Sequence, residues 1–254
     1  MPAIPDIRVA GSVQDWAHQA AAFIASVSER AILANGRFIM ALSGGSTPKT
    51  LYQALASPEW RGRFDWTKIY FLFGDERCVP ADHPDSNFNM ANSSLFHPLS
   101  IQADHVFRMR GEGEDPSAVA MEYEQAIRQL TGARPQTMPR IDLILLGLGD
   151  DGHTASLFPG TVAMQETEKI VTPGEAPTGI RTRLTLSLGV LNQAAVVLFL
   201  VMGEGKADMV RRILEPASDA DRSLPASKIA PESGQLVWML DQAAAAGLTR
   251  SLRK

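Results

Sequence analysis

The sequence predicts an α/β fold, in which a mostly parallel sheet carries helices on both faces. Short runs of almost entirely apolar residues alternate with helix-forming stretches along the 254 residues. Strands that are apolar at every position are typical of parallel sheets that are buried on both faces. The chain has no internal repeat and no low-complexity linker, so we expect one domain over residues 1–254.

The first half of the chain contains two clear helix starts. Ser12 can cap a long helix that ends at the residue before Gly36, a typical stop signal. Thr47 is predicted as the N-cap of a second helix, because Pro48 suits the first helical position. Between them, FIMAL at 38–42 is a predicted buried strand. The other elements predicted before residue 131 are a strand at 68–73 and helices at 86–96 and 115–130.

The second half continues the alternation. The segment 183–191 starts as a strand and turns near Gly189. Residues 161–182 are rich in Pro, Gly and Thr, and we expect a loop around a short strand near Ile170. The other predicted elements are strands at 141–146, 195–201 and 235–240 and a helix at 205–215.

Composition and charge exclude several classes of function. The net charge of −4 and the pI of about 5.8 argue against a nucleic-acid partner. The single cysteine, Cys78, excludes an internal disulfide and a cysteine-based zinc cluster, and it suits a reducing compartment. No signal peptide is predicted, and the longest apolar stretch, 194–202, is far shorter than the ~20 residues that span a bilayer. We expect a cytoplasmic protein without a membrane partner, as a monomer or weak homo-oligomer.

Polar or glycine-rich segments follow four of the predicted strands. They are SGGSTP at 43–48, GDERCVP at 74–80, GLGDDGHTASLFPG at 147–160 and MGEGKA at 202–207. Ligands of open parallel sheets bind at the carboxyl ends of the strands. We therefore expect these four segments to meet at one edge of the sheet and to form a ligand site.

The segment Ser43 to Thr47 predicts an anion-binding corner. Gly44 and Gly45 bring no side chain and tolerate unusual dihedral angles, so backbone N–H groups can point inward. The helix that follows directs its positive end to the same place, and Ser43, Ser46 and Thr47 add hydroxyl donors. The glycine spacing does not fit the nucleotide-binding P-loop. A capped strand-to-helix turn without a ligand is the alternative.

Gly147 to Gly152 formally matches G-x-G-x-x-G, but we reject a dinucleotide site. Asp150 and Asp151 would repel a pyrophosphate there, and such a match alone is weak. The loop instead places Asp151 two residues from His153. A carboxylate can fix the tautomer of an imidazole and raise its basicity, so this pair suits general acid/base chemistry. A surface loop with a structural histidine is the alternative.

Four more charged side chains lie at predicted strand ends. Asp75 offers a carboxylate, and Arg77 can bind an anion in a bidentate manner unless it pairs with Glu76. Lys206 opens a helix, where an ammonium opposes the helix dipole and favours a ligand anion as its partner. Arg183 begins a strand, and solvation at a sheet edge is its alternative role.

No metal and no cofactor are predicted. His83, His97 and His105 show no metal-ligand spacing on a predicted helix. A zinc site at His153 is conceivable with the neighbouring aspartates, but it would lack further ligands.

These motifs together resemble the 6-phosphogluconolactonase family. The similarity rests on SGGSTP, GDERCVP with a following SN, LGLGDDGHTASLFPG, RLTLS and GKA, which occur in the family's order from about Phe38 to about Lys206. The resemblance implies a fold related to those of ribose-5-phosphate isomerase and the CoA transferases. It also implies hydrolysis of 6-phospho-D-glucono-1,5-lactone in the pentose phosphate pathway, without a redox cofactor or a covalent nucleophile.

The resemblance implies roles for the site residues. His153 would deprotonate water and later protonate the leaving ring oxygen, with Asp151 orienting it. Asp75 would lie near the sugar hydroxyls or the reacting water. The phosphate would bind at residues 43–47, with Arg77, Arg183 or Lys206 closing over it.

Two other functions are compatible with these motifs. The wider superfamily includes glucosamine-6-phosphate deaminases, which usually carry Phe-Asn-Glu-Pro where this chain has Ser156 to Pro159. The ring-opening glutamate therefore has no counterpart here. The second rival is a non-catalytic sugar-phosphate sensor, which the intact Asp151/His153 pair disfavours.

Overall fold

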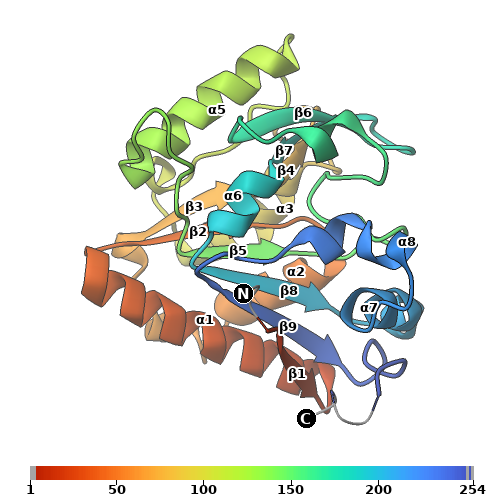
Figure 1. The fold of residues 1–254 in the computed structure, drawn as a ribbon. Helices are drawn as coiled ribbons and strands as arrows, with labels where there is room; N and C mark the ends of the chain where they lie inside the picture. Colours follow the sequence, from red (N-terminus) through yellow and green to blue (C-terminus); the bar gives the residue numbers. More distant parts are fainter. Residues whose placement is uncertain (1–3, 250–251, 253–254) are drawn as a thin grey trace.

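The fold is built on a six-stranded sheet in which all neighbouring strands run parallel (Figure 1). This computed structural model describes residues 4–249 and residue 252. The strands are β1 (Asp6–Ala10), β2 (Phe38–Leu42), β3 (Ile69–Phe73), β5 (Leu143–Leu146), β8 (Val196–Val201) and β9 (Gln235–Asp241). Their order is β1-β9-β8-β5-β2-β3. The predicted parallel sheet is therefore confirmed.

Both faces of the parallel sheet are buried, and alternate residues of each strand serve opposite faces. In β2, Met40 packs in one apolar core while its neighbours Ile39 and Ala41 pack in the other. The first core is covered by α1 (Val13–Asn35) and α2 (Ser46–Leu55), and the second by α5 (Pro116–Thr131), α6 (Leu188–Gln193) and α7 (Ala207–Leu214). This burial on both sides explains why the inner strands, such as β2, β5 and β8, are apolar at every position.

The two helix starts differ in how well the sequence predicts them. The side chain of Ser12 caps α1, and Gly36 ends the helix with a φ of 73°, as expected. Helix α2 begins at Ser46 and its N-cap is Gly45, so the prediction of Thr47 as the cap is wrong. Gly45 has a φ of 102°, and this conformation turns the chain from β2 into the helix within a few residues.

A second sheet, with three antiparallel strands, stands beside the first and was not predicted. It contains β4 (Asp75–Arg77), β7 (Thr182–Leu186) and β6 (Val171–Glu175) in the order β4-β7-β6. The short strand expected near Ile170 is present as β6, but it starts one residue later and pairs with β7. Pro173 and Gly174 lie inside β6, which is possible because β6 is an edge strand.

The remaining elements are short. The helix predicted at 86–96 is confirmed as α3 (Asn87–Ala91) followed by a π-helical turn, η3 (Asn92–Phe96). Strand β1 was not predicted, because it is only partly buried and lacks an apolar run. The other short elements are α4 (His97–Leu99), α8 (Asp219–Arg222) and the 3₁₀ helices η1 (Arg61–Arg63), η2 (Trp66–Lys68), η4 (Ala103–His105), η5 (Val162–Gln165), η6 (Glu204–Lys206) and η7 (Pro225–Lys228). Within the described part of the chain, no helix has both the length and the apolar character to cross a bilayer.

Candidate active site

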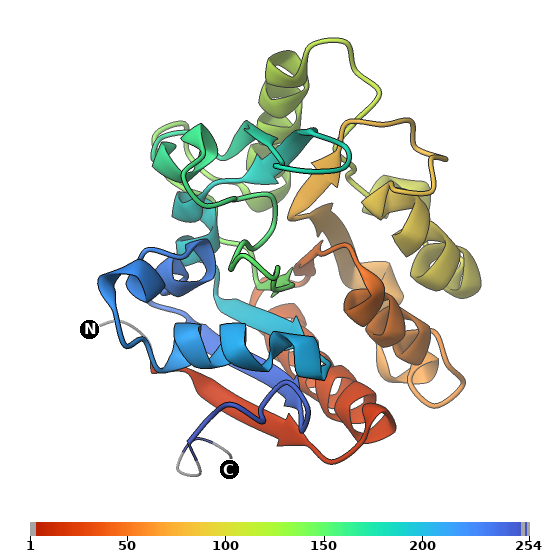
Figure 2. The ribbon, with the colours of Figure 1, turned by 90° about the vertical axis from the view of Figure 1, so that its right-hand side faces the viewer.

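The segments that follow β2, β3, β5 and β8 meet at one cavity of about 360 Å³. Figure 2 shows the edge of the sheet to which the strands point, with the green segment after β5 near its centre. Of the site residues predicted from sequence, the cavity is lined by Ser43, Gly44, Gly45, Asp75, Arg77, His153, Arg183 and Lys206. Ser46 and Thr47 form the adjacent first turn of α2, and Asp151 reaches the site through its contact with His153.

The corner after β2 is held by a buried tyrosine. The Tyr52 hydroxyl donates to the Ser43 carbonyl at 2.8 Å and accepts from the Ser43 amide at 3.0 Å. Burial raises the pKa of Tyr52, so the hydroxyl stays protonated and can make both bonds. The next four amides, at residues 44–47, have no acceptor among the described residues. The corner therefore presents free N–H donors at the positive end of α2, an arrangement suited to an anion.

Gly44 is required by a close contact with Asn87. A Cβ at Gly44 would lie 1.9 Å from Asn87 Oδ1. Asn87 lines the cavity, and its Nδ2 donates to the Asp75 carbonyl at 2.8 Å and to Asp75 Oδ1 at 3.2 Å. This amide side chain thus ties the anion-binding corner to β4. Its role was not predicted, although the Ser-Asn pair at 86–87 was part of the family motif.

The loop after β5 holds the imidazole of His153 in a fixed orientation. Asp151 Oδ1 lies 2.5 Å from His153 Nδ1 and accepts the His153 amide at 3.0 Å. The ring packs against Phe158 with a centroid separation of 4.4 Å. Because Nδ1 is engaged by the carboxylate, Nε2 is the ring nitrogen left for a ligand. The geometry is that of a histidine base with a carboxylate that selects its tautomer.

Replacing Gly149 by alanine is expected to lower turnover by about 10- to 100-fold. A Cβ at this position would lie 2.0 Å from His153 Nδ1, so the ring must move, and small displacements of catalytic groups cost this much. Steady-state kinetics with 6-phosphogluconolactone, the substrate that the resemblance implies, would measure the loss in kcat. Gly62→Ala is the matched control, because a Cβ there meets no atom within 4 Å. An unchanged kcat in Gly149→Ala would show that the position of the ring does not matter.

Asp75 is buried and is held by two neutral donors. Its Oδ2 accepts from Ser156 Oγ at 2.6 Å, and its Oδ1 accepts from Asn87. Ser156 comes from the loop after β5, 81 residues away in sequence. Its bond to Asp75 joins β4 to the His153 loop. Only 7% of Asp75 is exposed, so it can act on a ligand in the cavity but not on bulk water.

Glu76 has a structural role. Its carboxylate accepts from the amides of Arg77, Asn87 and Phe88 and from the hydroxyl of Ser86, which orders the start of α3. Burial raises the pKa of Glu76, although these donors oppose the shift. The possible ion pair with Arg77 is absent among the described contacts, because Glu76 bonds the Arg77 amide and not its guanidinium.

Arg77 and Arg183 are register partners in the antiparallel pairing of β4 with β7. Within the described residues neither makes an ion pair, and the Nε of each is buried without a hydrogen-bond partner. Arg77 Nη1 donates to the Asp85 carbonyl at 2.6 Å. Burial and the nearby charge of Arg77 lower the pKa of Arg183. Two half-desolvated cations side by side create a strong demand for an anion.

Lys206 has an internal partner. Its ammonium lies 2.5 Å from Asp150 Oδ1, and this contact lowers the pKa of Asp150. The sequence favoured a ligand anion as the partner of Lys206, and the structure supplies a carboxylate from the loop after β5 instead. Lys206 still lines the cavity. Across residues 4–249 and 252, no three His, Cys, Asp or Glu side chains are grouped as metal ligands would be.

The fold and the cavity define a class: an α/β protein with an anion-binding site at the carboxyl ends of a parallel sheet. The particular family follows from the sequence. The profile of the family described as glucosamine-6-phosphate isomerases/6-phosphogluconolactonase matches residues 11–238. The chain belongs to this family.

Individual relatives agree with this assignment. The 6-phosphogluconolactonase of Rattus norvegicus is 39% identical over 251 residues, covering 96% of this chain and 94% of that protein. The corresponding protein of Nostoc sp. is 39% identical over 221 residues, which cover 87% of this chain and 89% of that protein. These relatives are enzymes, and the chain is an enzyme of this family.

Solved structures give the same fold. The 6-phosphogluconolactonase from Trypanosoma brucei matches with a TM-score of 0.81 at 33% identity, over 97% of this chain and 100% of that one. A monomeric glucosamine-6-phosphate deaminase matches with a TM-score of 0.77 over 96% of this chain and 100% of that one. Its 22% identity shows a shared fold alone.

Proposed function

We propose that the chain hydrolyses 6-phospho-D-glucono-1,5-lactone to 6-phospho-D-gluconate, with His153 as the general base and without a metal. The observation that carries the proposal is the contents of one cavity. It contains an imidazole oriented by a carboxylate, two guanidinium groups that form no ion pair with any described residue, and a corner of amides that have no acceptor among those residues. A phosphorylated lactone needs a base at one end and a dianion site at the other.

The phosphate is proposed to bind between the corner at 43–47 and the arginine pair. Asn87 supports this arrangement, because it contacts Gly44 on one side and Asp75 of β4 on the other, two residues from Arg77. Free amides and guanidinium groups are both strong donors to phosphate oxygens. Holding the phosphate here would position the distant carbonyl carbon for attack, which can lower the barrier by several kcal/mol.

The reaction is proposed to begin with a water molecule bound at His153. Nε2 takes a proton from this water while its oxygen bonds to the lactone carbonyl carbon, and the carbonyl oxygen becomes an oxyanion. The adduct then collapses, the bond from carbon to the ring oxygen breaks, and the ring oxygen takes the proton from Nε2. Asp151 keeps the proton on Nδ1 throughout. The product is a carboxylic acid, which ionises in water.

Lys206 and Asp75 are proposed to act on the reacting end of the substrate. Lys206 is bound to Asp150, which lies close enough to His153 for the imidazole to influence its pKa. The ammonium is therefore tied to the loop that carries the base, which suits it to the oxyanion. Asp75 can accept a hydrogen bond from a sugar hydroxyl, because a carboxylate oxygen accepts more than one donor.

The expected result of a direct assay is that the protein accelerates opening of the phosphorylated lactone far more than opening of the unphosphorylated one. Acid release is followed by pH-stat against the spontaneous rate, with 6-phosphogluconolactone and with gluconolactone. We expect kcat/KM to be at least about 100-fold higher for the phosphorylated lactone, since several charge-assisted bonds are lost without the phosphate. Equal values of kcat/KM for the two lactones would contradict the proposed binding site for the phosphate. Ammonia release from glucosamine 6-phosphate, with no lactone hydrolysis, would replace the proposal with a deaminase.

A further inference from the structure

A second and larger cavity lies at the opposite end of the parallel sheet. Its volume is about 770 Å³, against about 360 Å³ for the candidate active site, and the two have no lining residue in common. It is formed at the amino ends of the strands, beside Ile39 of β2, Val196 of β8 and Gln235 of β9. Helix α1 forms one wall. We call it the amino-end cleft.

The amino-end cleft is strongly basic. It is lined by Arg30, Arg37 and Arg140, and Asp142 is the single carboxylate among the described residues that line it. Asp142 is already engaged, since its Oδ2 accepts the Ile39 amide at 2.8 Å. Burial raises the pKa of Asp142, and the charges of Arg37 and Arg140 oppose the shift. None of the three guanidinium groups forms an ion pair with any residue in the described part of the chain.

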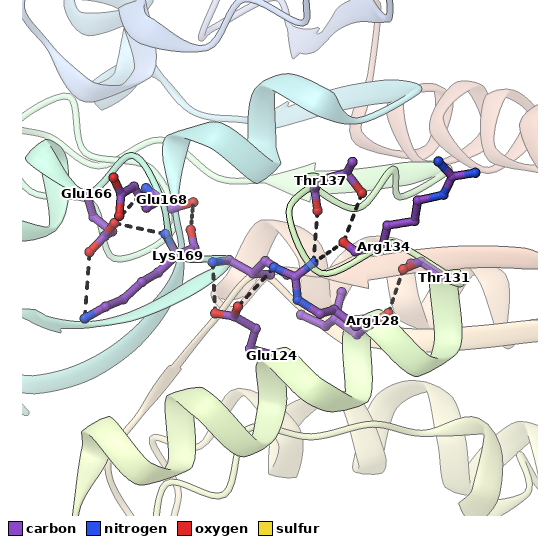
Figure 3. A network of polar contacts seen from close by, with 11 residues as sticks. Glu124, Arg128, Thr131, Arg134, Thr137, Glu166, Glu168 and Lys169 are labelled. Carbon is purple, nitrogen blue, oxygen red and sulfur yellow. Dashed lines mark hydrogen bonds and ion pairs between the residues drawn. The ribbon is translucent and has the colours of Figure 1, made fainter.

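The wall opposite α1 is held in place by a network of polar contacts (Figure 3). Arg128 Nη1 donates to the carbonyls of Arg134 at 2.8 Å and Thr137 at 3.0 Å, and Arg128 pairs with Glu124 on the same helix. This fixes the loop that runs from α5 to β5. Arg140, at the end of that loop, donates from Nη1 to Ser233 Oγ at 2.8 Å and from Nη2 to the Ser233 carbonyl at 3.1 Å. The side of the cleft that carries Arg140 is therefore formed before any ligand binds, which lowers the cost of binding.

The other lining residues are mostly apolar. The sides and floor include Val27, Ala31, Ile39 and Val196. Ligand pockets for small molecules have volumes of roughly 300–1,000 Å³ and combine an apolar lining with a few charged groups. The apolar or planar part of a ligand can pack on this lining while the charged end of the same ligand contacts the arginines.

We propose that the amino-end cleft binds a phosphorylated organic anion of the size of a nucleoside di- or triphosphate. Three arginines against one aspartate call for a ligand with at least two negative charges. Guanidinium groups bind phosphate oxygens in a bidentate manner and stack on planar rings, so they suit both parts of such a ligand. The amino-end cleft is independent of the lactonase proposal, because no residue of the candidate active site takes part in it.

The test is isothermal titration of the full chain with ATP at low ionic strength. Binding at one site is expected, with an affinity stronger than about 1 mM. The variant Arg37→Gln/Arg140→Gln is expected to weaken ATP binding by at least tenfold, because two charge-assisted contacts are lost. Arg37→Gln alone keeps the Arg140–Ser233 bonds and should still weaken binding about threefold or more. Arg63→Gln, which removes an exposed charge elsewhere, is the matched control and should bind normally.

Two further titrations show at which of the two cavities ATP binds and which part of ATP the amino-end cleft holds. In Arg77→Gln/Arg183→Gln, ATP should still bind at the amino-end cleft as tightly as in the unchanged protein, because the two cavities have no lining residue in common. Inorganic triphosphate should bind at least about tenfold more weakly than ATP, since it cannot use the apolar lining. The proposal is overturned by no ATP binding at millimolar concentration, or by binding that survives loss of Arg37 and Arg140. Equal affinity for triphosphate and ATP would overturn the claim that the cleft binds the organic part of the ligand.

Discussion

Replacing His153 by alanine is expected to lower kcat for the phosphorylated lactone by about 100-fold or more. The imidazole is the group with a free nitrogen facing the cavity and a carboxylate behind it, at 2.5 Å from Nδ1. Without it, a water molecule in the site must lose its proton to solvent, and the ring oxygen must leave without a proton donor. The phosphate contacts are untouched, so KM should change little. Initial rates, corrected for spontaneous opening of the lactone, measure both constants.

The control for this prediction is another histidine. His97 is exposed on a short helix, and His97→Ala should have normal kinetics. Thermal unfolding of His153→Ala should remain cooperative, because the ring is part of a surface loop with a third of its side chain exposed. Near-normal kcat in the alanine variant would remove His153 from its proposed role.

In Asp151→Asn we expect a smaller loss of kcat than in His153→Ala, with a shift in the pH profile of kcat, because the oxygen of the amide can still accept from Nδ1–H.

Removing Arg77 or Arg183 is expected to raise KM for the phosphorylated lactone by about 10- to 100-fold, because one hydrogen bond to a charged group contributes roughly 1.5–3 kcal/mol. The value of kcat should fall less. The ratio of kcat/KM between phosphorylated and unphosphorylated lactone should collapse in the double variant Arg77→Ala/Arg183→Ala. Kinetics with both lactones give this ratio directly, and Arg63→Ala serves as the charge-matched control.

The stability of these arginine variants gives an independent check. The two arginines are register partners, and burial and the nearby charge of Arg77 lower the pKa of Arg183, so their proximity costs stability in the folded protein. Loss of the Arg77 bond to the Asp85 carbonyl costs about 1 kcal/mol and offsets part of the relief. Arg183→Ala makes no such loss, so its melting temperature should equal or exceed that of the unchanged protein. A large drop in melting temperature would point to a structural role for Arg183 and not to a role in binding.

The parallel sheet could be predicted because burial on both faces leaves a direct mark on the sequence. Phe38 to Leu42 is apolar throughout since odd and even positions serve different cores. The antiparallel sheet leaves no such mark. Strand β4 has only three residues and coincides with the site motif, while β6 contains a proline and a glycine. Strand β6 exists because it pairs with β7, and the local sequence of β6 does not encode this pairing.

In the candidate site too, some features could be predicted from the sequence and others could not. The glycine-rich corner, the Asp-Gly-His loop and the arginines were predictable because each has a local chemical pattern after a strand. The contacts that hold them were not, because they join distant parts of the chain. Ser156 reaches Asp75 across 81 positions, and Lys206 reaches Asp150 across 56. Sequence alone presents Lys206 as a cation in need of a ligand, and only the fold shows the carboxylate beside it.

Because Lys206 is paired with Asp150, a substrate oxygen that binds this ammonium has to compete with a carboxylate. Such an oxygen gains less than it would from an unpaired cation, and it gains most where it displaces the carboxylate. A neutral ester carbonyl competes poorly with a carboxylate, whereas the fully charged oxygen of the tetrahedral adduct competes well. Asp150 is almost entirely exposed, so it can return to water when displaced. Lys206 would then stabilise the adduct far more than the bound lactone, and such selectivity raises the rate without tightening the hold on substrate.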